Sequence, residues 1–384
     1  MTKKITKKII FILVLMVFGG FGGVIADRYF FPYLSTTKLF SKYEFLKKGS
    51  EDITIINRTE QITVKEETSI SKIANQVSSS VVNIVSYADN GAKGTSAKNA
   101  VASKNGTGVV VTGDGIVMTY ASAINLVDSK YQVMTYNGAV YEASLFGVDS
   151  FSNLAFLSIN ADNLSSASFA DSDNIRGGEK VIAVANSFGS YTNRYAAGLI
   201  SDFNPEYNLA GFGLSSSEKL EGVYEADLNF QKYFIGGSVI DYTGQIVGMV
   251  GAIEKNNMQS FFLIPSNKIK LVIERAIKKE LGMNPTLGIY YVPLSKIYAL
   301  QNNLGVEAGA LIYSASGQQG LAVITNSPAQ AAGLKLNDII TAVNDQKITL
   351  EKSLPDLLYL HKKGEKIDLT ILRDGMEIMI TVKL

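Results

Sequence analysis

The most informative stretch of this sequence is Tyr224-Glu-Ala-Asp-Leu-Asn-Phe-Gln-Lys-Tyr-Phe-Ile-Gly-Gly-Ser-Val-Ile-Asp-Tyr-Thr-Gly-Gln-Ile-Val-Gly-Met-Val250. Two short apolar runs, 238–240 and 246–250, are joined by turn-forming residues at 241–244. β-Branched and apolar runs of this length around a glycine-containing turn are typical of a β-hairpin. The stretch therefore predicts two paired strands, with the glycines Gly236-Gly237 directly before the first of them.

The composition of the whole chain limits the functions that this hairpin can serve. Its 384 residues suffice for about two or three domains. The hydrophobic fraction of 46% and the charged fraction of 18% are typical of a globular chain, and a formal charge of +1 argues against nucleic acid as a partner. The chain has no cysteine and a single histidine, His361, which excludes disulfides, cysteine-ligated metals and multi-histidine metal sites. We therefore expect no cofactor and no metal.

The N-terminal residues 1–34 are typical of a membrane anchor. An uncharged, mostly apolar run extends from Ile9 to Ala26, about the length that a helix needs to cross the hydrocarbon core. Lysines precede the run and aromatic residues follow it, which predicts a cytoplasmic N-terminus and an interfacial aromatic belt. The segment therefore predicts a transmembrane helix with the body of the chain outside the cytoplasm. A cleaved signal peptide that ends at Val24-Ile-Ala26 is the alternative.

Between this anchor and the hairpin the sequence first turns polar and then β-rich. Residues 35–67 are charged with weak periodicity, and we interpret them as a tether. Apolar residues at helical spacing predict a short helix over 69–77. Short β-branched runs at spacings of roughly ten residues then indicate antiparallel barrels or sandwiches. The strands expected besides the hairpin are 80–87, 108–112, 116–119, 131–136, 139–147, 154–159, 180–185, 195–202, 222–226 and 260–264.

Four segments outside the hairpin match a known family in its own order. Gly106-Thr-Gly-Val-Val-Val-Thr-Gly-Asp-Gly-Ile-Val-Met-Thr119 resembles its Gly-Ser-Gly, strand, Asp-Gly, strand, Thr pattern. Its Ala-Ile-Gly-Asn-Pro-Phe-Gly, Gly-Ile-Val-Ser and Phe-Ala-Ile-Pro-Ser-Asn segments resemble Val181-Ile-Ala-Val-Ala-Asn-Ser-Phe-Gly189, Ala197-Gly-Leu-Ile-Ser201 and Phe262-Leu-Ile-Pro-Ser-Asn267. With the hairpin, the chain resembles the trypsin-like serine proteases of the HtrA/Deg family. The resemblance implies a mostly β fold, with a trypsin/chymotrypsin-like double β-barrel over 68–266.

The same resemblance locates a catalytic triad, and this sequence departs from it at each position. In the family a histidine follows the second strand, an aspartate opens an Asp-Leu-Ala-Val-Leu strand, and the nucleophile lies in Asn-Pro-Gly-Asn-Ser-Gly-Gly-Pro-Leu. The residues at these positions are Ser122, Asn153 and Ile235, and Tyr233-Phe234 replaces the Gly-Asn of the oxyanion loop. A triad needs a hydroxyl nucleophile, an imidazole base and an orienting carboxylate. We therefore interpret the barrels as lacking the triad-based hydrolytic mechanism.

The sequence leaves alternatives open around this loop. Ser238 or Ser122 could pair with Lys232 as a rearranged dyad, which would make the chain an active serine-type endopeptidase. A serine within a strand and a solvated lysine are the simpler interpretation. The large residues 233–235 either fill the former cleft or form an exposed apolar patch for a partner. Of these two we favour filling.

The C-terminal part of the chain is interpreted as a second functional domain. Residues 267–283 predict a connecting helix that ends at Gly282. Residues 284–384 resemble the PDZ domain of the HtrA arrangement, through Thr286-Leu-Gly-Ile-Tyr290 and Asn326-Ser-Pro-Ala-Gln-Ala-Ala-Gly-Leu334 among other pieces. The resemblance implies an α+β domain that captures peptides.

Peptide capture is expected at the start of this domain. Backbone amides of Leu287, Gly288 and Ile289 would form a nest for a C-terminal carboxylate, and the ligand would add as a strand beside residues 289–291. A flanking helix is expected to begin within 350–353. The further residues expected at the site are Tyr290, Leu354, Leu357 and Leu358, with core packing as the alternative for the leucines. We expect His361 to interact with the dipole at the end of that helix.

These features together predict a pseudoprotease anchored in the bacterial cell membrane. Its PDZ domain would bind unfolded chains or C-termini outside the cytoplasm, in protein quality control or as a regulator or adaptor of an active HtrA homologue. The resemblance also implies a homo-oligomer, such as a trimer. The alternative is an active serine-type endopeptidase with a rearranged site.

Overall fold

The computed structural model describes residues 2–30, 33–34, 71–73, 75, 77–88, 104–186, 192–211, 214–255 and 258–384. These residues belong to two compact units, Met1–Ser71 and Lys72–Leu384. The predicted tether 35–67 lies outside the described residues. Residues 71–73, 75, 77 and 78 are helical, as expected for the second half of the short helix at 69–77.

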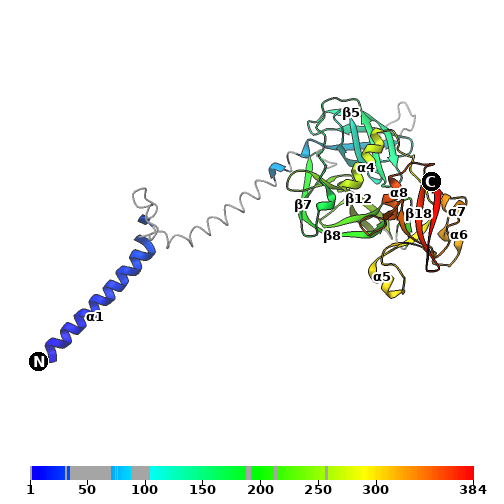
Figure 1. The fold of residues 1–384 in the computed structure, drawn as a ribbon. Coiled ribbons are helices and arrows are strands. Elements are labelled where there is room, and N and C mark those ends of the chain that lie inside the picture. The colour runs from blue at the N-terminus through cyan, green and yellow to red at the C-terminus, as the bar shows by residue number, and fades with distance from the viewer. Residues whose placement is uncertain are drawn as a thin grey trace. The chain divides into compact units, whose positions relative to one another are not determined.

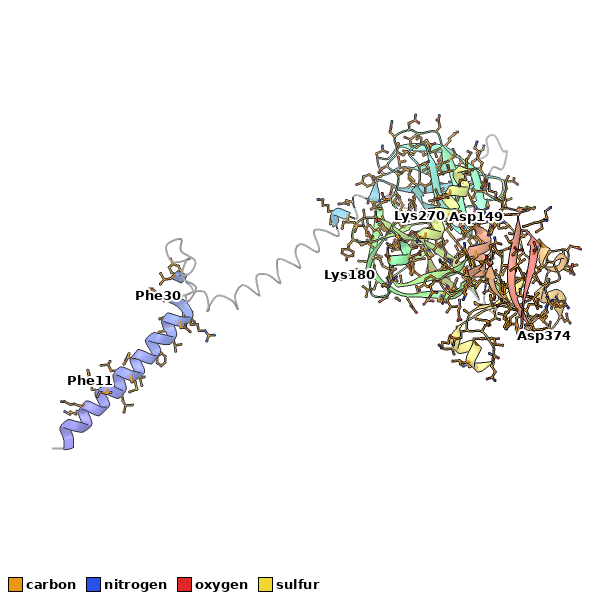
Figure 2. The ribbon with its side chains drawn as sticks, in the orientation of Figure 1. Phe11, Phe30, Asp149, Lys180, Lys270 and Asp374 are labelled. Carbon is orange, nitrogen blue, oxygen red and sulfur yellow. The ribbon has the colours of Figure 1, made fainter. Side chains whose placement is uncertain are left out.

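The described residues of the first unit lie mainly in one long helix. The helix α1 spans Thr2–Ile25 and continues into the π-helical turn η1, Ala26–Phe30. Figure 2 shows the side chains of Phe11 and Phe30 standing out from it, with 65% and 58% of their surface exposed. Within the described residues, Phe11–Phe30 is the one helical segment long and apolar enough to cross a membrane. An apolar helix with no buried residue in this window has the composition that a bilayer requires.

The second unit begins with a closed six-stranded barrel, drawn mainly in cyan in Figure 1. Its strands are antiparallel in the order β1-β2-β3-β6-β5-β4, and apolar residues of these strands form a common core that includes Val82, Val117 and Leu157. Closure leaves the barrel without free edge strands. Its strands are β1 Val81–Ala88, β2 Lys104–Val110, β3 Ile116–Tyr120, β4 Ser129–Met134, β5 Val140–Asp149 and β6 Leu154–Ile159.

A second closed barrel follows, in green in Figure 1, with the order β10-β13-β12-β11-β7-β8. The predicted hairpin is present, because β11 pairs with β12 with Ser238 opposite Met249. The two barrels confirm the trypsin-like double barrel. The chain between β8 and β10 contains one strand that the sequence did not predict, β9, Ser215–Ser216. This strand does not belong to the barrel. The strands of this barrel are β7 Lys180–Asn186, β8 Asn193–Asn208, β10 Glu221–Asp227, β11 Ser238–Ile240, β12 Ile246–Lys255 and β13 Met258–Pro265.

The connecting helix α4 spans Ser266–Ile277 and ends earlier than predicted. Lys279 takes a left-handed backbone, with φ of 57°, and the amide of Glu280 bonds the carbonyl of Arg275. This is a Schellman motif, which satisfies the last helical carbonyls. The prediction that the helix continues to Gly282 was therefore wrong, because the chain turns at a lysine and uses Gly282 only for the next turn.

The C-terminal residues form an antiparallel sheet flanked by short helices, in orange and red in Figure 1. The sheet order is β19-β18-β16-β15-β14-β9, so its last strand comes from the segment between β8 and β10 of the second barrel. The helix α8, Leu354–Tyr359, begins where expected, with Ser353 and Asp356 in a capping box. The other elements are β14 Tyr290–Leu294, α5 Lys296–Gln301, β15 Gly309–Ile312, α6 Gln319–Ala322, α7 Pro328–Ala331, β16 Ile339–Val343, β17 Gln346–Lys347, β18 Lys366–Arg373 and β19 Met376–Lys383.

Buried polar contacts join the barrels to the C-terminal sheet. The guanidinium of Arg275 on α4 donates to the carbonyls of Tyr359 and His361 at 2.6 and 2.7 Å. The carboxylate of Asp149, labelled in Figure 2, accepts from Asn284 at 2.7 Å and from the hydroxyl of Tyr359 at 3.2 Å. Because the side chain of Asp149 is fully buried, these bonds hold the two parts in a fixed arrangement.

Candidate functional site

The three positions that the sequence resemblance assigns to a triad lie together between the two barrels. Ser122 lies in a 3-10 turn, η4, Ala121–Ala123, directly after β3. The carbonyl of Asn153 accepts from the amide of Ala121 at 2.8 Å, and its side-chain amide lies 3.4 Å from the hydroxyl of Tyr120. The fold therefore brings Ser122 and Asn153 to the same turn.

The loop that carries Ile235 reaches the same turn from the second barrel. At Gly236 φ is 79°, and an added Cβ would lie 2.3 Å from Oγ1 of Thr119 and 2.4 Å from the carbonyl oxygen of Thr107. Only glycine combines this backbone with so close an approach. The amide of Gly236 donates to the carbonyl of Val250 at 2.9 Å, which fixes the loop on the hairpin.

The side chains at the three positions have little acid–base chemistry. Ser122 is an exposed hydroxyl, Asn153 a neutral amide, and Ile235 a hydrocarbon with 6% of its surface exposed. None of them accepts a proton near neutral pH. The single histidine, His361, lies in the C-terminal domain, where its ring nitrogens face Glu365 at 2.8 Å and Asn344 at 3.4 Å. His361 lies two residues after the end of helix Leu354–Tyr359, and its predicted interaction with the helix dipole stays a prediction.

The backbone of the former oxyanion loop is turned inward. Residues Lys232–Phe234 form a 3-10 turn, η6. The amide of Phe234 donates to Gln231 at 2.8 Å and the amide of Ile235 to Lys232 at 3.2 Å, both to backbone carbonyls. An oxyanion hole requires donors that point toward the substrate. The amide that the family would use at position 235 is already taken by its own turn.

The large side chains of this loop pack into the second barrel. Phe234 has 2% of its surface exposed and belongs to the barrel core, where its ring lies 5.8 Å from that of Phe230 and 4.9 Å from that of Tyr233. Tyr233 is half-buried under the guanidinium of Arg194, 5.0 Å from the ring centroid. Of the two interpretations of residues 233–235, filling agrees with this burial better than an exposed patch.

The rearranged dyad is not assembled in this structure. The hydroxyl of Ser238 is fully buried in β11 and has no hydrogen-bond partner within the described part of the chain. Lys232 is exposed to solvent in η6. A dyad needs the amine within hydrogen-bond reach of the hydroxyl. Ser122 is exposed, but it lies in the first barrel and no bond joins it to Lys232 among the contacts described.

The second candidate site is the nest of backbone amides that begins the C-terminal domain. The amides of Leu287 and Gly288 donate to one carboxylate oxygen, Oε1 of Glu218, at 3.0 and 2.8 Å. The amide of Ile289 donates to the hydroxyl of Ser217 at 3.1 Å. A φ of 83° at Gly288 turns the amides toward one point. The expected nest holds a carboxylate, and the carboxylate belongs to the chain itself.

The strand edge expected for a ligand is also occupied. In the antiparallel pair of β9 and β14, Ser216 lies opposite Tyr290 and Ser215 opposite Tyr291. Sequence reasoning missed β9, because the run Leu214-Ser-Ser-Ser-Glu218 has the composition of a polar loop. The one local indication is a glutamate that follows three serines. It predicts an internal ligand only when the position of the amide nest is also known.

Of the other predicted peptide-site residues, the tyrosine is exposed and the leucines are buried. Tyr290 keeps 37% of its surface exposed. The leucines Leu354, Leu357 and Leu358 of α8 are buried with Leu287 and Ile289 in the core of the domain. Because all three are buried in this core, the alternative of core packing describes them better.

A buried carboxyl group lies behind β9 and was not expected from the sequence. Glu221 accepts from the hydroxyl of Tyr291 at 2.8 Å and from the amide of Asn208 at 3.3 Å. Burial raises its pKa to about 7, although hydrogen bonds from Ser215, Tyr291 and Asn208 oppose the shift. No group of three or more potential metal ligands occurs among the described residues.

Comparison with known proteins identifies both domains. The trypsin-like peptidase domain family matches residues 106–249, and the PDZ domain family matches residues 285–384. Serine protease Do-like HtrA of Lactobacillus helveticus is 30% identical over 293 residues, covering 73% of this chain and 68% of that protein. The chain belongs to the HtrA family. A second HtrA relative, serine protease Do-like HtrA of Lactococcus lactis subsp. cremoris, is 28% identical over 402 residues, which cover 96% of this chain and 94% of that protein.

A solved HtrA structure shares the fold. The HtrA-type protease AlgW with tripeptide superposes with a TM-score of 0.64 at 22% identity, over 82% of this chain and 95% of that one. At this identity the likeness establishes the arrangement of barrels and PDZ domain and nothing about chemistry. Whether this HtrA member cleaves peptides depends on its own residues.

Proposed function

We propose that this chain is a membrane-anchored HtrA pseudoprotease that binds peptides through its PDZ domain. The observation that carries the proposal is the nucleophile loop. Ile235 occupies the serine position, and the amide of Ile235 is bonded to the carbonyl of Lys232. A hydrolase of this fold needs both a nucleophile and donors for the oxyanion. Ser122 and Asn153 supply neither the base nor its orienting carboxylate.

The binding function rests on the amide nest at Leu287, Gly288 and Ile289. A nest at the end of a β-strand edge is the arrangement that captures a C-terminal carboxylate and an extended peptide, once the edge is free. AlgW, a structural relative, was solved with a tripeptide, which is consistent with a peptide-binding role here. The proposed ligands are unfolded chains or C-termini, in protein quality control or in regulation of an active HtrA homologue, with a homo-oligomer such as a trimer as the assembly.

The proposed location is the bacterial cell membrane, with the barrels and the PDZ domain outside the cytoplasm. The length and exposure of Phe11–Phe30 support a single crossing. Lysines before the helix support a cytoplasmic N-terminus. Residues 35–67 would then be the tether between membrane and barrels.

The enzymatic part is tested with the full-length chain in detergent, using fluorescent casein and a fluorophosphonate probe that labels activated serines. We expect neither turnover nor labelling. An active HtrA relative serves as the positive control, and Ser122→Ala and Ser238→Ala serve as matched variants. Turnover that either variant abolishes would establish the rearranged endopeptidase instead.

The binding part is tested with decapeptides that carry a free C-terminal carboxylate and with their amidated counterparts. We expect binding of the free acids to exceed that of the amides, because only the carboxylate can accept from the nest. Gly288→Val should abolish binding, since a Cβ at this position would lie 2.3 Å from that of Ser327. Equal binding of acids and amides would refute capture of C-termini.

A further inference from the structure

The segment Ser215–Glu218 lies in the PDZ domain as a bound peptide would. Ser215 and Ser216 pair antiparallel with β14, and Ser217 exchanges hydrogen bonds with the backbone of Ile289. The next residue, Glu218, places its carboxylate on the amides that begin the domain. The strand therefore ends at a carboxylate in the nest, which is the pattern of a C-terminal ligand added to a sheet edge.

The carboxylate of Glu218 explains why a side chain can take the place of a C-terminal carboxylate in the nest. Two backbone amides converge on its Oε1, at 2.8 and 3.0 Å, which are distances of well-formed N–H···O hydrogen bonds. The hydroxyls of Ser216 and Ser217 add bonds to the same carboxylate at 3.0 and 2.7 Å. Without such an acceptor, the partly buried amides of the nest would lose their partners, which costs free energy.

The segment is also held from behind, by residues of both barrels. The side-chain amide of Asn208 donates to the carbonyls of Ser216 and Lys219, each at 3.2 Å. The amide of Leu220 donates to the carbonyl of Phe151 at 3.0 Å. Because both ends of the segment are fixed in the same compact unit, its effective concentration at the nest is high.

We propose that Ser215–Glu218 is an internal ligand that keeps the PDZ groove closed, and that a peptide C-terminus binds by displacing Glu218 from the nest. This inference rests on the proposed peptide-binding function and assigns its regulation. The apparent affinity of the groove for a peptide equals its intrinsic affinity multiplied by the fraction of molecules in which the segment has left the groove. A partner that withdraws the β8–β10 segment therefore opens the groove, and a bound peptide releases that segment from β14.

Hydrogen–deuterium exchange of the full-length chain in detergent tests the closed state without any peptide. We expect slow exchange at the amides of residues 287–289 in the wild-type chain. Glu218→Ala should raise the exchange rate of the Leu287 and Gly288 amides by about tenfold or more, because it removes their acceptor. Glu218→Gln, which keeps the shape, should give an intermediate rate. Glu142→Ala removes an exposed carboxylate of the first barrel and should change nothing. Unchanged exchange in a folded Glu218→Ala chain would overturn the inference.

Peptide affinity tests the consequence. Free-acid decapeptides should bind Glu218→Ala about ten- to a hundredfold more tightly than the wild-type or Glu142→Ala chain, because competition by the internal carboxylate is lost. Equal affinity of all three chains would overturn the internal ligand while leaving peptide binding intact. Faster exchange in Glu218→Ala without binding of any peptide would uphold the internal ligand and refute the proposed function.

Discussion

The carboxyl group of Glu221 and the hydroxyl of Tyr291 lie 2.8 Å apart and join the second barrel to the PDZ sheet. Both side chains are almost fully buried; Glu221 belongs to β10, the strand that follows β9 in the chain, and Tyr291 belongs to β14, which pairs with β9. Burial raises the pKa values of both groups, because it disfavours their charged forms. The junction between the domains is therefore most stable when the carboxyl of Glu221 is protonated.

Stability should accordingly fall as the pH rises. A folded pKa of about 7 against an ordinary value of 4.5 means that the folded chain binds this proton more tightly than the unfolded chain. Between these pH values the free energy of unfolding should decrease by about 3 kcal/mol in total. The charged groups that face the site are Asp356, which raises the pKa further, and Lys268, which pairs with Asp356 at 2.8 Å.

Urea unfolding measured from pH 4.5 to 7 checks this slope. Glu221→Gln should remove most of it, because an amide does not titrate. Glu225→Gln alters an exposed residue of the same strand and should leave the slope in place. If wild type and Glu221→Gln lose stability equally, the buried carboxyl is not the cause.

The turn at Gly236 should tolerate no side chain. Gly236→Ala combines a positive φ with a contact of 2.3 Å, so the two barrels would have to separate locally, at a cost of about 3 kcal/mol or more. Gly138→Ala is the matched control, since φ is 84° there and nothing lies within 4 Å. It should cost only about 1 kcal/mol. Chemical unfolding of both variants measures the difference, and equal losses would contradict the close approach.

Arg275 should be irreplaceable even by lysine. Its guanidinium donates to the carbonyls of Tyr359 and His361 and lies 4.3 Å from the ring centroid of Tyr359. Both bonds come from one nitrogen, Nη2, and lysine offers neither the second nitrogen, Nη1, which lies 3.4 Å from Oδ1 of Asn284, nor a planar face over the ring. Arg275→Lys should lower the free energy of unfolding by about 2–4 kcal/mol. Arg176→Lys, at an exposed position, should change it little, and calorimetry of both variants compares them.

Restoring the three triad residues should not restore activity. A chain with Ser122→His, Asn153→Asp and Ile235→Ser regains the side chains, but the amide at 235 stays bonded to Lys232 as long as the Tyr233-Phe234 turn persists. We expect no casein turnover and no fluorophosphonate labelling, because the oxyanion donors are missing. Replacing residues 230–234 by the family loop as well should permit labelling. Activity of the triple variant alone would show that this backbone is competent.

Membrane attachment should depend on the first helix. The full-length chain should sediment with membranes and resist extraction by carbonate, because Phe11–Phe30 is long and apolar enough to span them. Replacing two central residues, Leu15 and Val17, by arginine should release the chain, since each charge is costly in the hydrocarbon core. A chain that stays soluble after expression without these changes would refute the anchor.

Much of the fold was predictable from the sequence because it depends on local patterns. The short apolar runs around turn residues gave the strands of both barrels, and the hairpin at 238–250 is paired as expected. The start of α8 also lies close to the expected residues 350–353. The end of α4 was not predictable, because its left-handed residue is a lysine, Lys279, and glycine was the better local candidate.

The candidate sites likewise have features that the sequence determined and features that only the tertiary structure decided. The amino-acid sequence by itself determined which side chains stand at Ser122, Asn153 and Ile235, and hence which chemistry they can perform. It also placed the amides of residues 287–289. The tertiary structure alone decided that Phe234 enters the barrel core and that the amide of Ile235 is taken.

The tertiary structure also decided what fills the PDZ nest. Glu218 and Gly288 are 70 residues apart in the chain, and nothing in either neighbourhood predicts the other. They meet because the segment between β8 and β10, which contains Glu218, lies against β14. There the carboxylate of Glu218 accepts from amides that would otherwise be left without an acceptor. Local propensity cannot encode such a contact, since its stability arises only when both domains are folded and packed.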